Sequence, residues 1–145
     1  MPDHHSSFVW FTMAVIVAGC NPFESSFIKT CEAALKDTLL APSTYRRVVA
    51  TESRSPIPLE LYLAQENKSE AVKKFLRQQN TTATRFVVVF EYDAANAYGT
   101  PLRLSAECSY DTTGDDPSSA HEFTVRINGK TKNDRMADAI RRLNQ

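Results

Sequence analysis

The thiol of Cys20 is the side chain near the start of this sequence whose position points most directly to chemistry. It ends a run of 13 residues that begins at Phe8, in which Thr12 is the only polar side chain. A helix that crosses a bilayer needs about 20 apolar residues, and shorter runs of this kind are typical of signal peptides. A short buried helix in a soluble protein is the alternative interpretation.

The residues that lead into this cysteine are small or aliphatic. Val17-Ala18-Gly19-Cys20 resembles the lipobox of bacterial lipoproteins, in which a peptidase cuts before the cysteine and the cysteine receives lipid. The resemblance implies that residues 1–19 are a lipoprotein signal peptide and that residues 20–145 form a periplasmic domain. A mature lipoprotein carries two or three acyl chains, which is enough for a stable tether to the bilayer.

The residue after the cysteine bears on location. In enteric bacteria an aspartate at this position tends to retain a lipoprotein in the inner membrane, whereas this chain has Asn21. The resemblance therefore implies a protein of the cell envelope, anchored through acylated Cys20, facing the periplasm, with a slight preference for the outer membrane.

Two cysteines remain once Cys20 carries lipid. Cys31 and Cys108 form an even pair, and the implied compartment is oxidising, so we predict a disulfide between them. Two buried, unpaired thiols are the alternative, because free cysteine is often buried as a small apolar residue.

The composition places limits on partners. Removing the leader leaves 126 residues, 145 minus 19, which is a normal size for one domain. The full chain has 17 basic and 17 acidic residues, and only Asp3 is lost, so the net charge is near +1. A chain this close to neutral has no electrostatic reason to bind nucleic acid or an anionic bilayer.

The cysteines must be positioned by a helix and a strand. Phe27, Cys31 and Leu35 recur every four residues, which predicts an amphipathic helix that ends near Ala41, before Pro42. Apolar alternation over residues 101–111 predicts a strand that points Cys108 inward.

Other segments complete the predicted fold. Further strands are expected over residues 45–52, 84–92 and 121–128, and further helices over residues 59–80, broken near Asn67, and 133–144. The continuous Val and Phe run in 84–92 predicts a central strand buried on both faces. The expected fold is a single small α+β domain, with an antiparallel sheet of about four strands and helices packed on one face.

One connection has the composition of a recognition loop. Asp93 and Asn96 favour turns through side-chain bonds to the backbone, Gly99 allows a positive φ, and Tyr98 adds an amphipathic ring. "YDAANAYG", with "LLAPSTYRRV" upstream, resembles a pattern of small, mostly uncharacterised bacterial envelope proteins, which implies no activity. An ordinary hairpin turn is the alternative to a candidate binding loop.

A second acidic connection has oxygen atoms at the spacing of a calcium loop, contributed by Asp111, Thr113, Asp115, Ser119 and Glu122. The position that needs glycine in such a loop holds aspartate, and the flanking segments are expected to be strands. A solvated acidic turn is therefore the preferred interpretation, and we expect no metal site.

Catalytic patterns are lacking. After cleavage His121 is the only histidine, and the sequence has no nucleophile elbow, P-loop or dinucleotide fingerprint. A carboxylate pair such as Glu91 and Glu107 remains open as an alternative. Arg46 and Arg47 must point to opposite faces of a strand, so at least one is expected in an ion pair or an anion site.

These observations predict a membrane-anchored, non-catalytic interaction module that binds an envelope protein and needs no cofactor. The alternative function is an inhibitor or immunity-type protein that blocks a cell-wall hydrolase or toxin by loop insertion.

Overall fold

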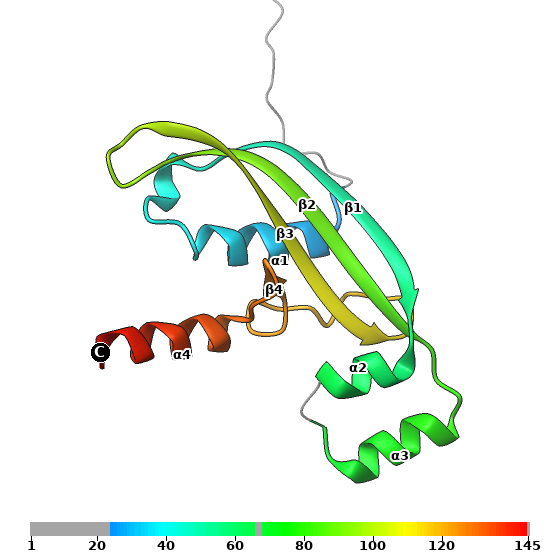
Figure 1. Ribbon diagram of the computed structural model, residues 1–145. Coiled ribbons are helices and arrows are strands. Elements are labelled where there is room, and N and C mark those ends of the chain that lie inside the picture. The colour runs from blue at the N-terminus through cyan, green and yellow to red at the C-terminus, as the bar shows by residue number, and fades with distance from the viewer. Residues whose placement is uncertain (1–23, 66–67, 145) are drawn as a thin grey trace, which may run out of the picture.

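The computed structural model describes residues 24–65 and 68–144 (Figure 1). The predicted leader and Cys20 lie outside the described residues. Within them the chain forms, in order, α1 (Ser26–Lys36), the 3₁₀-helix η1 (Pro42–Thr44), β1 (Arg46–Ile57), α2 (Leu59–Gln65), α3 (Glu70–Gln78), β2 (Ala83–Ala95), β3 (Pro101–Thr113), β4 (Arg126–Ile127) and α4 (Lys132–Leu143).

The four strands form one sheet in the order β1-β2-β3-β4, and every neighbouring pair is antiparallel. A short turn joins β2 to β3, whereas α2 and α3 lie between β1 and β2, and consecutive strands still lie side by side. The predicted small α+β domain with a four-stranded antiparallel sheet is confirmed.

The main core lies between α1 and one face of the sheet, called here the inner face. Phe27 of α1 packs edge to face on Phe86 of β2, with 6.0 Å between ring centroids. Cys31 and Cys108 are fully buried in this layer and are joined as a disulfide, with 5.8 Å between their Cα atoms. The predicted pair is confirmed, because helix spacing and strand alternation turn both thiols into the same core.

The opposite face of the sheet, called the outer face, is not covered as the sequence predicted. Residues of β2 alternate between buried and more exposed, and Val89 is 41% exposed. The expectation of a strand buried on both faces is therefore wrong. Among the described residues α1 covers the inner face of β2, and the sequence of β2 alone does not indicate that its outer face is left without a helix.

The helices do not form one layer. Figure 1 shows α1 beneath the sheet, α2 and α3 beyond the ends of the strands, and α4 at the side. Tyr62 and Leu63 of α2 make a small second core with Ala83. Among the described helices α1 alone contributes residues to the main core, so helix packing on one face holds for α1 only.

Several predicted boundaries are wrong. β1 continues through Pro56, which an edge strand tolerates because its N–H side can face solvent. α1 ends at Lys36, where the hydroxyl of Thr38 donates a hydrogen bond to the carbonyl of Leu35 at 2.7 Å. β4 holds two residues instead of eight, since the backbone N–H of Thr124 bonds back to the carbonyl of His121.

The break predicted within residues 59–80 is confirmed by two separate helices, α2 and α3, and Ser69 caps the second. None of the helices in the described part of the chain combines the length and the apolar character needed to span a bilayer.

Candidate functional site

The predicted binding loop lies at the tip of the β2–β3 hairpin, at the opposite end of the sheet from α2 and α3 (Figure 1). Asp93 belongs to β2, and Asn96, Tyr98 and Gly99 form the turn. The structure therefore brings the four predicted residues together. β1 pairs with β2 only as far as Asp93, whereas β2 and β3 pair as far as Ala95 and Pro101, so the hairpin tip projects beyond the end of β1.

Asn96 organises the turn. Its side-chain oxygen accepts hydrogen bonds from the backbone N–H groups of Tyr98 at 2.9 Å and Thr100 at 3.0 Å. Its own N–H donates to the carbonyl of Thr100, and its carbonyl accepts from Gly99. Gly99 has φ +80°, a conformation that favours glycine. Local bonds thus hold the turn in one shape.

The base of the hairpin is also tied down. The carboxylate of Asp93 accepts two hydrogen bonds from Arg103 on the facing strand, at 2.7 and 3.2 Å. This contact holds the pKa of Asp93 below its usual value. The hydroxyl of Thr44, from η1, accepts a bond from the N–H of Ala95 at 2.9 Å, which fixes the hairpin against the preceding segment.

Tyr98 is the side chain that this scaffold presents to solvent. It is 93% exposed, and Leu102 and Leu104 on β3 behind it are about two-fifths exposed. We call Tyr98, Leu102 and Leu104 the hairpin surface. A large amphipathic ring on an ordered turn can contact a partner with little loss of conformational entropy. The arrangement is suited to recognition of a protein surface.

A polar cluster that the sequence did not predict lies on the outer face of the sheet. The side chain of Asp111 is fully buried and accepts bonds from Arg85 at 2.7 and 2.8 Å, with Arg126 at 3.5 Å. Gln65 of α2 accepts a further bond from Arg85. The contact with Asp111 raises the pKa of Arg85.

This cluster borders a hollow of about 410 Å³, lined by Gln65, Arg85, Glu107, Ser109, Arg126 and Gly129. An aspartate in a strand pattern is the only sequence signal of the cluster, because its other members come from α2, β2 and β4. The carboxylate of Asp111 pairs with both guanidinium groups, and the bond from Arg85 to Gln65 links α2 to the sheet.

The acidic residues that have the spacing of a calcium loop do not come together in the structure. Asp111 lies in β3 and binds Arg85, whereas Glu122 binds Lys132 at 2.9 Å. Over the described ranges, no three His, Cys, Asp or Glu side chains gather in a way that could hold a metal ion.

The other chemical candidates are also placed. Glu107 is the register partner of Val89, so it lies diagonally across from Glu91 on the outer face. The ring of His121 lies 6.3 Å from that of Phe123, in the turn before β4. The histidine is thus placed beside an aromatic ring instead of beside the two glutamates.

The two arginines at the start of β1 point to opposite faces, as predicted. Arg46 is the register partner of Asp93 on the outer face, and Arg47 is that of Tyr92 on the inner face. Arg47 forms ion pairs with Glu24 at 2.5 Å and Glu32 at 3.5 Å, which ties β1 to α1. The ion-pair interpretation of this residue is confirmed.

Replacing Asp111 with asparagine is expected to lower the free energy of unfolding by about 2 kcal/mol, because Arg85 loses its charged partner in a buried site. Urea denaturation measures the change. Asp93→Asn is the matched control, since its pair with Arg103 is exposed to solvent and is expected to contribute less to stability. Equal losses in the two variants would show that Asp111 has no special role in stability.

Comparison with known proteins gives no family assignment: no family model matches this chain, and no curated protein and no solved structure shows significant similarity to it.

Proposed function

We propose that this chain is a lipid-anchored, non-catalytic interaction module of the bacterial cell envelope. In this proposal Cys20 carries the acyl anchor, the domain faces the periplasm, and the hairpin surface binds an envelope protein. A slight preference for the outer membrane follows from Asn21.

The observation that carries the binding part of the proposal is the exposure of Tyr98 on an ordered turn. Its ring is 93% exposed, while the hydrogen bonds of Asn96 fix the backbone beneath it. Exposed tyrosines of this kind are common among residues that dominate binding energy, because they bury a large area at small entropic cost. Two further apolar side chains, Leu102 and Leu104, are partly exposed on β3, the strand that follows the turn.

The compartment is supported by the disulfide. Cys31 and Cys108 are bonded across the core. Such bonds persist in the periplasm and outside the cell and are rare in the cytosol. The disulfide is therefore consistent with the compartment that the proposed lipoprotein leader implies.

The test is capture of a partner from detergent-solubilised envelope by the intact chain. The wild-type chain is expected to retain an envelope protein, and Tyr98→Ala is expected to weaken that interaction about 30-fold, the loss typical of a dominant contact residue. Phe75→Ala is the control, because Phe75 is an exposed aromatic residue on α3, away from the hairpin. Capture that survives Tyr98→Ala, or is lost equally in the control, would contradict the proposal.

An inhibitor or immunity-type function is the second candidate, because the hairpin tip extends past β1 with Tyr98 at its end. A hairpin of this shape can enter the cleft of a cell-wall hydrolase or toxin. Inhibition of a muramidase by the intact chain, abolished by Tyr98→Ala, would favour this function. Unchanged muramidase activity in the presence of the chain would count against it.

A further inference from the structure

Helix α4 carries an apolar stripe that the rest of the described chain leaves uncovered. Met136, Ile140 and Leu143 follow one another at helical spacing and are 53%, 59% and 86% exposed. No residue of α4 is buried. Figure 1 shows the helix extending from the body of the domain, with the C-terminus at its free end.

The helix is attached by polar contacts at its beginning. Thr131 and Asp134 form a capping box, so the helix begins at Lys132, one residue before the predicted range of 133–144. The ammonium group of Lys132 binds Asp37 at 3.1 Å and Glu122 at 2.9 Å. The attachment therefore orders α4 without using its apolar stripe.

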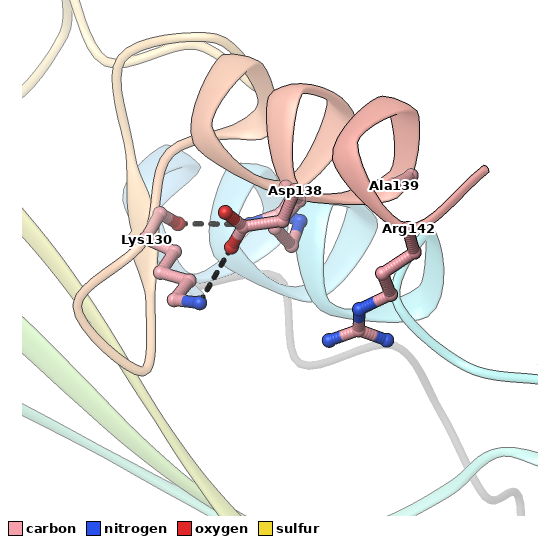
Figure 2. Close-up of a pocket in the computed structure, with 5 residues that line it drawn as sticks. Lys130, Asp138, Ala139 and Arg142 are labelled. Carbon is pink, nitrogen blue, oxygen red and sulfur yellow. Dashed lines mark hydrogen bonds and ion pairs between the residues drawn. The ribbon is translucent and has the colours of Figure 1, made fainter. Parts of the chain in front are cut away.

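The segment that contains α4 is basic, although the whole chain is neutral. Residues 130–143 include five basic and two acidic side chains, a net charge of +3 by sequence, and one of the basic groups, Lys132, is paired with Asp37 and Glu122 outside the segment. Figure 2 shows Lys130 paired with Asp138, while Arg142 extends away from that pair. Arg135 and Arg142 are seven residues apart and so lie along the same flank of the stripe. An anionic bilayer can therefore attract this helix, although the chain as a whole is close to neutral.

We propose that α4 lies on the surface of an anionic bilayer, with Met136, Ile140 and Leu143 at the boundary between headgroups and acyl chains. A marked apolar face, a charged opposite face and low mean hydropathy are typical of interfacial helices. The arginines at the edge of the stripe contact lipid phosphates. This inference rests on the proposed tether, because three apolar side chains bind weakly unless an anchor keeps the domain at the membrane.

A bilayer fits this surface better than a second copy of the chain. Two α4 helices that shared their stripes would bring two segments of charge +3 together, and like charges repel across such a contact. An anionic lipid surface instead attracts each basic residue, with about a fivefold gain in binding per residue. The charge of the helix therefore selects the membrane.

The experiment uses tryptophan fluorescence of the intact chain. Trp10 is the only tryptophan of the sequence and is removed with residues 1–19 in the proposed lipidated chain, so Leu143→Trp places a single reporter on the stripe. In vesicles with equimolar phosphatidylglycerol, the reporter is expected to shift to shorter wavelength and to be quenched by lipids with brominated acyl chains. In pure phosphatidylcholine vesicles both effects should be at least tenfold smaller.

Charge reversal provides the matched comparison. Arg135→Glu with Arg142→Glu, the two arginines that flank the stripe, is expected to abolish quenching in the phosphatidylglycerol vesicles. Lys73→Glu with Lys74→Glu, an equal change of charge on α3, is expected to leave it intact. Equal effects of the two pairs would overturn the proposal.

Two further results would overturn it. One is a reporter that stays solvent-exposed in phosphatidylglycerol vesicles. The other is a reporter that becomes buried in detergent solution as the protein concentration rises, which would assign the stripe to a second copy. Flotation with both kinds of vesicle measures whether the acyl anchor binds the chain to a bilayer. This result is independent of the reporter, so failure of the anchor is distinguished from failure of α4 to insert.

Discussion

Replacing Cys31 and Cys108 together with alanine is expected to lower the free energy of unfolding by about 4 kcal/mol. The bond closes a loop of 77 residues, and releasing it gives the unfolded chain much more conformational freedom. Both side chains are fully buried between α1 and β3, so the variant also loses packing in the core. Domains are stable by only about 5–15 kcal/mol, so the loss amounts to between about a quarter and four-fifths of that free energy, and urea denaturation measures it.

Reductant provides the control for this prediction. It should destabilise the unmodified chain to a similar extent and leave the double alanine variant unchanged. Cys20→Ala should unfold like the unmodified chain, because it keeps the bonded pair. Alkylation of two thiols in folded, unreduced protein would contradict the prediction.

The disulfide was predictable because each half of it is a local pattern. The four-residue spacing of Phe27, Cys31 and Leu35 defines one face of a helix, and alternation along β3 directs Cys108 inward. A helix that lies on the sheet then brings the two faces together. The pairing itself was predicted from the even count that remains once Cys20 carries lipid and from the implied oxidising compartment, and these two local patterns supported it.

Burial of β2 could not be predicted in the same way. The run of Val and Phe indicated two covered faces, but within residues 24–65 and 68–144 no helix layer covers the outer face, and Val89 is exposed. Which elements cover a strand depends on the path of the whole chain. The predicted length of β4 was wrong for a different reason: the chain forms a local turn between His121 and Thr124 instead of extending the strand.

In the candidate site, too, the features set by neighbouring residues were predictable, and those set by residues far apart in the sequence were not. Asn96 and Gly99 were recognisable as turn residues because the bonds they make lie within the turn itself. The Asp111 cluster was missed because Gln65, Arg85 and Arg126 reach it from three separate elements. Alternation along β3 alone does not identify the partners of a buried aspartate.

Replacing Cys20 with serine is expected to abolish incorporation of labelled palmitate. The lipobox chemistry needs a thiol at that position, and a hydroxyl does not replace it as the acceptor. The variant should also keep residues 1–19, because the peptidase acts on the acylated form. Labelling and intact mass of the protein from an envelope fraction measure both effects. Asn21→Ala changes the neighbouring residue and should be labelled and processed normally.

The two possible failures of this experiment have different meanings. Label that persists in Cys20→Ser would place the acyl group elsewhere, and the bonded state of Cys31 and Cys108 leaves neither thiol available to accept it. Absence of label in the unmodified chain would remove the tether, and with it the reason for α4 to bind a bilayer. The oxidising compartment would then rest on the buried disulfide alone, and the hairpin surface would remain as a binding site for a partner in that compartment.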